Sequence, residues 1–301
     1  MPRMPSLVVF GLTVGACATS PRPPAEPPAL CVLDRAGAPA AAARGPWIPL
    51  LVRGYDSRTH LVTSPALDCT GVQARWESPA LRCADGASAG ATFPESPITE
   101  SDVATSDIGP ESTLAWIATT SYASGDAAGP VALVVRSPSQ LRVVAVGVLR
   151  SFPRNVKLRL ERLGETKVLV AEGDLCAPGK AASCTRFARV VPLVGSRFVP
   201  MALVGEDGQC DSPALFELSK VERRRSRRGW ELAELSTALA FGTDGLTVQE
   251  QVVVHDLGES ERGEPLRVLH RAQASRVVRW EEGRMVTSGS PLWSRMAPGM
   301  R

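Results

Sequence analysis

Histidine and aromatic side chains are scarce in this chain of 301 residues. There are 3 His, and Phe, Trp and Tyr together make up 5% of the sequence. A mechanism that depends on imidazole therefore has only His60, His255 and His270 to use. A charge excess is also lacking, because 34 basic and 31 acidic residues leave a formal net charge of +3. This balance creates no general basic surface, so we expect no nucleic-acid partner.

The linear motifs of common enzymes and metal sites are missing as well. The sequence contains no Gly-x-Ser-x-Gly turn for a hydrolase nucleophile, no His-Glu-x-x-His and no Cys-x-x-Cys pair. These motifs supply an activated serine or closely spaced metal ligands. We therefore expect no metal and no cofactor, and we assign no catalytic residue.

Long apolar runs are absent, and the most apolar segment lies near the start. It runs from Leu7 to Ala16 after a single early cation, Arg3. About ten apolar residues are too few to cross a bilayer, which needs roughly 20. The layout is that of a secretory signal peptide, which indicates export.

The end of this segment carries a recognisable pattern. Val14, Gly15 and Ala16 precede Cys17, which places an aliphatic residue three positions before a cysteine and small residues between them. The pattern resembles the lipobox of bacterial lipoproteins. The resemblance implies that Cys17 becomes the acylated N-terminus of the mature protein, and Ala18 in place of Asp favours the outer membrane. An ordinary signal peptide, with Cys17 incidental, remains the alternative.

The composition then divides the chain into four parts. Residues 1–16 form the predicted signal peptide and residues 17–46 a tether rich in Pro and Ala, which has too few large apolar side chains to fold. Residues 47–112 form an N-terminal β segment with Cys69, Cys83 and an acidic loop. Residues 113–295 form the main antiparallel β domain.

Within the N-terminal β segment, two short apolar pieces predict strands, and an acidic stretch follows them. The strands are predicted at Ile48–Val52 and Val72–Trp76. The stretch Gly86–Thr113 carries five acidic residues and no Lys or Arg, and it shows no period. We interpret it as a solvated loop, with a cation- or partner-binding loop as the alternative.

Alternating hydrophobicity predicts the fold class of the main domain. Val156, Leu158 and Leu160 alternate with charged residues, which is typical of a strand with one buried face. Leu141–Leu149 is apolar on both faces, as in a central strand. We expect an all-β, antiparallel sandwich or irregular meander, with a few-bladed propeller-like arrangement as the alternative. A short helix is the alternative to a strand within Trp230–Phe241. Turns are predicted at Leu163-Gly164, Asp207-Gly208, Asp244-Gly245 and Glu282-Gly283.

The cysteines predict disulfides, because an exported chain meets an oxidising compartment. Six remain once Cys17 is set aside, and six cysteines allow 15 pairings. Closeness in sequence favours Cys69 with Cys83 and Cys176 with Cys184. Elimination then pairs Cys31 with Cys210.

The strongest surface feature is an arginine cluster on a predicted loop. It consists of Arg223, Arg224, Arg225, Arg227 and Arg228. Guanidinium groups bind phosphates and carboxylates through paired hydrogen bonds. The cluster is therefore a candidate anion-binding site for an anionic lipid, a glycan or an acidic protein. A solvated hairpin tip is the alternative.

Taken together, these patterns favour a non-enzymatic binding or structural module that a lipid holds at the cell envelope. The alternative is an envelope hydrolase with a site near His255 and His270, since Asp256 follows the first of these histidines.

Overall fold

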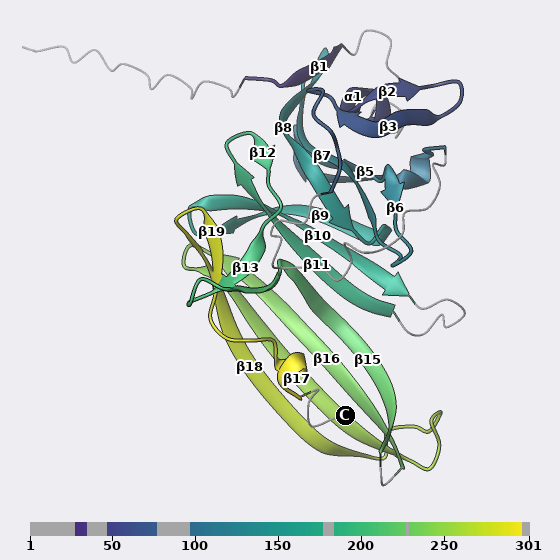
Figure 1. Ribbon diagram of the computed structural model, residues 1–301, viewed down its shortest axis with the longest axis vertical. Coiled ribbons are helices and arrows are strands. Elements are labelled where there is room, and N and C mark those ends of the chain that lie inside the picture. Colours follow the sequence, from purple (N-terminus) through teal and green to yellow (C-terminus); the bar gives the residue numbers. More distant parts are fainter. Residues whose placement is uncertain (1–27, 35–46, 77–96, 177–183, 227–228, 297–301) are drawn as a thin grey trace, which may run out of the picture.

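The all-β fold class is confirmed. The computed structural model describes residues 28–34, 47–76, 97–176, 184–226 and 229–296 (Figure 1). In these residues, 17 strands form one hydrogen-bonded, mostly antiparallel sheet, and a separate hairpin joins β2 (Val52–Asp56) to β3 (Leu61–Asp68). This continuous open sheet is not divided into propeller blades within the described part of the chain.

The first half of the sheet is an antiparallel meander, and a short helix covers its outer face. Its strands are β1 (Cys31–Asp34), β4 (Val103–Gly109), β5 (Ser112–Ile117), β6 (Thr120–Ser121), β7 (Ala127–Arg136) and β8 (Gln140–Ser151). The short helix α1 (Trp47–Leu51) packs on it, where Leu51, Ile117, Val134 and Val143 are fully buried.

The second half contains the longest strands. They are β9 (Arg154–Leu163), β10 (Thr166–Cys176), β11 (Cys184–Val194), β13 (Ala202–Gly205), β14 (Cys210–Pro213), β15 (Leu215–Ser226), β16 (Gly229–Gly242), β17 (Gly245–Gly258), β18 (Arg267–Glu281) and β19 (Arg284–Thr287). β9 to β11 pack against the first half through a core that includes Trp116, Leu149, Leu169 and Val191. The two halves therefore form two layers.

The halves are linked by one very short strand. β12 (Arg197–Phe198) pairs antiparallel with β11 and parallel with β8, with Phe198 opposite Gly147. A Cβ atom at residue 147 would lie 2.2 Å from the carbonyl oxygen of Phe198. The backbones approach so closely that only glycine fits there.

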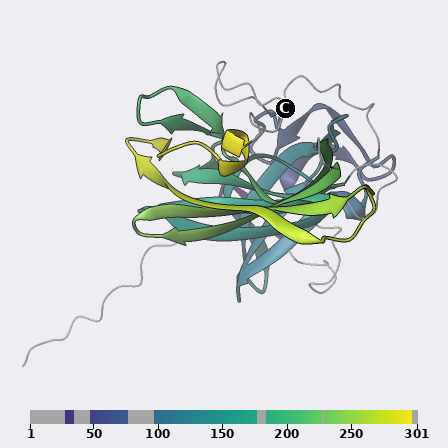
Figure 2. The same ribbon diagram turned by 90° about the horizontal axis from the view of Figure 1, so that it is seen from below.

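Four long strands project from the body as an arm. The second half coils around a core that includes Val170, Phe216, Leu246 and Met285. Beyond this core, β15, β16, β17 and β18 extend alone and form the arm (Figure 1). The C-terminal helix α2 (Leu292–Met296) covers one face of the arm (Figure 2). The opposite face of the arm carries exposed side chains.

Three predictions for the N-terminal segment are wrong. Ile48–Val52 forms helix α1 up to Leu51, because Ile48, Leu50 and Leu51 bury together in a single turn. Val72–Trp76 makes only an isolated bridge at Gln73. The predicted loop Gly86–Thr113 contains β4, whose alternating exposure rests on Ala, Thr and Ser side chains that carry little hydrophobic signal.

The predictions for the main domain hold better. Trp230–Phe241 lies in β16, so the helix alternative is wrong: pairing with β15 and β17 on both edges overrides the helical spacing. The four predicted turns are confirmed, and their glycines, Gly164, Gly208, Gly245 and Gly283, all have positive φ.

The disulfides are partly as predicted. Cys176–Cys184 is confirmed and joins paired residues of the β10–β11 hairpin. Cys31 bonds to Cys69, so the predicted Cys69–Cys83 and Cys31–Cys210 pairs are wrong. The pairing of β1 with β8 brings Cys31 to the end of β3, which closeness in sequence did not indicate. These two disulfides indicate an oxidising compartment outside the cytosol.

The remaining cysteine predictions are less fully tested. Cys210 is also disulfide-bonded. Cys17 and Cys83 lie outside the described residues.

Candidate functional site

An open trough of about 520 Å³ lies on the arm. It crosses the middle of β16, β17 and β18. Its lining consists of Ser236, Ala238, Gln249, Glu250, Gln251, Gln273, Ala274 and Ser275. Small and amide side chains thus dominate the trough.

Strand register explains why these side chains gather. Ser236 lies opposite Gln251, which lies opposite Gln273, and the Gln273 amide nitrogen donates to the Gln251 amide oxygen at 2.9 Å. Residues directly opposite each other project from the same face of a sheet. A second row, two residues along each strand, consists of Ala238, Gln249 and Ser275. The two rows form a polar strip on the face opposite α2.

The one carboxylate of the lining is already engaged. Glu250 is 6% exposed and alternates toward the α2 face, where it accepts a hydrogen bond of 2.9 Å from the Leu292 amide. The Arg276 guanidinium lies 3.8 Å from it. The nearest charged side chains of the open face are Glu234 and Arg271, which belong to the next row. The polar strip itself is uncharged.

Sequence reasoning did not identify this strip. The available signal was a set of uncharged polar residues on predicted strands, as at Gln249 and Gln251 between Val248 and Val252. Such a pattern marks any half-exposed strand. Only the register aligns the rows across three strands.

The two candidate catalytic histidines lie nearer the tip of the arm. His255 on β17 faces Glu234, with 3.4 Å between Nε2 and Oε2. His270 on β18 is exposed and lies opposite Val254. Neither lines the trough or the second hollow, of about 280 Å³, beside the Cys31–Cys69 disulfide.

The described arginines of the cluster, Arg223, Arg224 and Arg225, were predicted on a loop but lie in strand β15. Arg224 pairs with Glu231 at 2.6 Å, and the Arg223 guanidinium donates to the Glu261 carbonyl. Arg225 is exposed, opposite Trp230. Two of the three described arginines thus already have partners. Arg227 and Arg228 lie outside the described residues.

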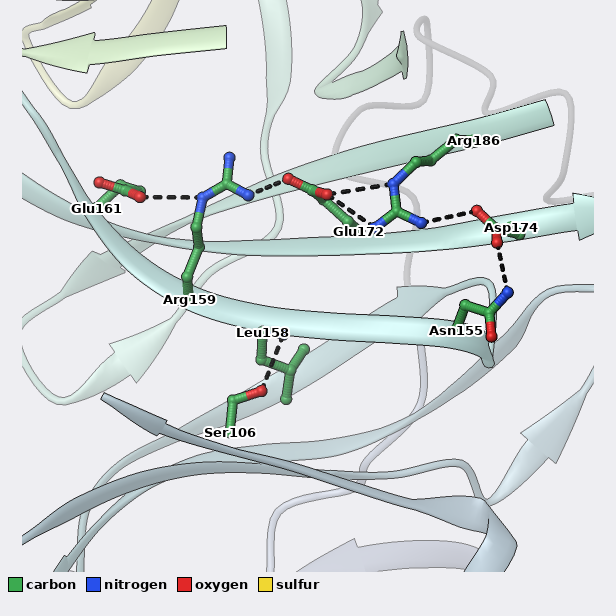
Figure 3. A network of polar contacts seen from close by, with 8 residues as sticks. All are labelled: Ser106, Asn155, Leu158, Arg159, Glu161, Glu172, Asp174 and Arg186. Atoms are coloured by element: carbon green, nitrogen blue, oxygen red, sulfur yellow. Dashed lines mark hydrogen bonds and ion pairs between the residues drawn. The ribbon is translucent and has the colours of Figure 1, made fainter. Parts of the chain in front are cut away.

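A network of charges binds β9, β10 and β11 to one another (Figure 3). Glu172 on β10 lies between Arg159 of β9 and Arg186 of β11. Arg186 also pairs with Asp174 at 2.9 Å, and the Asn155 amide donates to Asp174 at 2.7 Å. Burial raises the pKa of Glu172, but the hydrogen bonds and charges of the two arginines outweigh it and lower the pKa. Every charge here has a partner, which indicates a structural clamp.

A second charged group is buried beneath the first half of the sheet. Arg150 and Asp126 form an ion pair with side chains 1% and 4% exposed. The Arg150 guanidinium lies over the Tyr122 ring, 3.8 Å from its centre, and burial raises the pKa of the Tyr122 hydroxyl. This pair is internally satisfied and opens into neither hollow.

Within the described part of the chain, no group of three His, Cys, Asp or Glu side chains is arranged to hold a metal ion. No helix in these residues is long and apolar enough to span a bilayer. Comparisons with protein-family models, with curated proteins and with solved structures found no match for the chain.

Proposed function

We propose that this chain is a lipid-anchored binding module of the cell envelope that holds an uncharged polar ligand on the open face of its arm. Envelope glycans belong to that ligand class. The observation that carries the proposal is the uncharged strip of Ser236, Gln249, Gln251, Gln273 and Ser275 that lines the trough.

The chemistry of the strip suits such a ligand. A primary amide donates and accepts hydrogen bonds, as does a hydroxyl, so Gln and Ser can match sugar hydroxyls and acetamido groups. Each bond contributes only about 0.5–1.5 kcal/mol net. Five such side chains give roughly 2.5–7.5 kcal/mol before the cost of association is subtracted, so a single site binds weakly. Repeated units of a polymer would raise the apparent affinity.

The shape of the molecule supports an anchored module. The described chain begins beside β1, and the tip of the arm lies at the other end of the long axis (Figure 1). A lipid on Cys17 would therefore hold the body at the membrane and direct the arm away from it. The disulfides agree with an envelope location.

Two other readings have less support. The hydrolase alternative requires His255 and His270 beside a hollow, and neither histidine lines the trough or the hollow beside the Cys31–Cys69 disulfide. An anionic partner requires free guanidinium groups, whereas Arg223 and Arg224 already bind Glu261 and Glu231.

The proposal is tested by calorimetric titration of the purified protein with the β-1,4-linked tetramer of N-acetylglucosamine, which carries hydroxyl and acetamido groups and no charge. We expect a triple Gln249→Ala, Gln251→Ala, Gln273→Ala variant to lose at least about tenfold in affinity, because three amide contacts are removed. The matched control is Gln209→Ala, on an exposed turn away from the arm. Equal affinities of the triple variant and the wild-type protein, or no binding to either, would overturn the proposal.

A further inference from the structure

One edge of the arm is not paired along much of its length. β18 pairs with β17 from Arg267 to Val278, but β19 joins its other side only from Val278 to Glu281. Within the described residues, no strand pairs with the outer side of Arg267–Ser275. In Figure 1 this edge forms one margin of the arm.

The direction of the backbone groups on this edge follows from Val277. Its amide donates to the Ser288 hydroxyl at 3.2 Å, and its carbonyl accepts from the Ser288 amide at 3.1 Å. Both groups therefore point away from β17. Because backbone direction alternates along a strand, Ser275, Gln273 and Arg271 point the same way. Three amides and three carbonyls are thus directed to the open edge.

The middle of the edge, from Ala272 to Ser275, has little of the protection that usually prevents strand addition, whereas Arg267, His270 and Arg271 lie toward the tip. Native sheets block their edges with Lys, Pro, charges or bulges. The opposite margin of the arm is protected in this way, because β15 carries Lys220, Glu222 and the arginines at 223–225. By contrast, residues 272–275 of β18 are Ala, Gln, Ala and Ser, and the β17–β18 bulge lies nearer the tip, at His255.

The residue types along the edge decide in which register a second copy of the strand could pair with it. An antiparallel pair of identical strands has a two-fold axis, so one residue must face its own copy. An axis at Arg271 would oppose two guanidinium groups, and an axis at Ser275 would require Val277, which Ser288 already occupies. An axis at Gln273 has neither defect. It faces Gln273 with Gln273, and Arg271 with Ser275.

We propose that β18 pairs antiparallel with β18 of a second copy of this chain, centred on Gln273. Three facing pairs then form about six backbone hydrogen bonds. The two Arg271 side chains lie four residues apart along the strands, about 14 Å, which exceeds the screening length of about 8 Å in physiological salt. The Gln273 side chain, which contacts Gln251 in its own copy, then faces Gln273 of the second copy. The open faces of both arms become one surface.

The pairing is tested first in cells, with the full-length chain. A photo-crosslinking amino acid replaces Gln273, and two copies with different tags are expressed together. We expect a covalent product that carries both tags. The matched control replaces Gln249, exposed on the neighbouring strand and away from the edge, and should give no such product. A product with only another protein, or no product from position 273, would overturn the proposal.

A charge exchange distinguishes pairing from an effect on folding. Gln273 is exposed, so Gln273→Lys and Gln273→Glu should leave the monomer folded. Each variant alone should raise the dissociation constant of the dimer about tenfold in sedimentation of the detergent-solubilised chain, because like charges face each other across the axis. A mixture of the two variants should recover association. Association that neither variant weakens, or that the mixture does not restore, would contradict this pairing. No glycan is present in the sedimentation measurement, so its result does not depend on the proposed ligand.

Discussion

At the scale of single residues, the charge of Glu172 joins three neighbouring strands. Its side chain is 15% exposed and contacts Arg159 and Arg186, which lie on the two neighbouring strands. The arginines lower its pKa, so the folded state favours the carboxylate more than the unfolded chain does. The stability that it contributes is therefore present above its unfolded value of 4.5 and is lost as the pH falls through the lower, folded pKa.

Replacement of this carboxylate should make the free energy of unfolding less dependent on pH in the acidic range. We expect Glu172→Gln to lower the free energy of unfolding at pH 7 by about 1 kcal/mol, a modest value because Arg159 is partly exposed. The difference from the wild-type protein should shrink below pH 4.5. Urea unfolding between pH 3 and 7 measures it. A difference that stays constant over that range would contradict the assigned pKa direction.

Gly147 controls how closely the two halves of the sheet approach. The Cβ atom of Gly147→Ala would lie 2.2 Å from the Phe198 carbonyl oxygen, so β12 would have to move. We expect a loss of about 1–3 kcal/mol in the free energy of unfolding. Gly109→Ala is the control, because a Cβ atom there meets nothing within 4 Å. Equal unfolding midpoints for the two variants in urea would argue against the close approach.

At the scale of elements, the two disulfides close loops of different length. Cys31–Cys69 spans 38 residues and Cys176–Cys184 spans 8. In the chain-entropy model, the longer loop contributes about 4 kcal/mol and the shorter about 2.5 kcal/mol. The Cys31→Ala, Cys69→Ala double variant should therefore lose more stability than Cys176→Ala, Cys184→Ala. Chemical unfolding of both double variants tests this order, and the reverse order would contradict it.

The elements also show what sequence alone could predict. The strands of the main domain were predictable because residues such as Leu158 and Leu160 alternate strictly with charges. β4 was missed because small Ser and Thr side chains hide its period, and α1 because one helical turn is too short to show one. The Cys31–Cys69 bond and the polar strip depend on which strands become neighbours. That choice is made by contacts far apart in the sequence, so local patterns did not contain it.

At the scale of the whole molecule, the proposed lipid anchor would decide where the arm is presented. The lipobox-like segment predicts that Cys17 is acylated. We expect Cys17→Ser to abolish incorporation of an alkyne-labelled fatty acid and to move the protein from the membrane pellet to the soluble fraction. Cys83→Ser, which leaves the segment intact, is the control. Unchanged labelling of the Cys17→Ser variant would refute the lipid anchor.

The proposed function depends on the arm. The face of the arm that α2 covers contributes to stability, since Leu235, Val252 and Val254 pack with Leu292 of α2. Its open face contributes the uncharged strip instead. One strand therefore serves stability with alternate residues and presents the others on the open face, as the two-residue period of β structure allows.

The most direct measurement is a nuclear magnetic resonance titration of the ¹⁵N-labelled protein with the N-acetylglucosamine tetramer, followed at the side-chain amides of glutamine. We predict concentration-dependent shifts for Gln249, Gln251 and Gln273, and none for Gln209. An absence of shifts at the three arm glutamines at millimolar ligand, or shifts confined to other positions, would contradict the assignment of the open face as the binding surface.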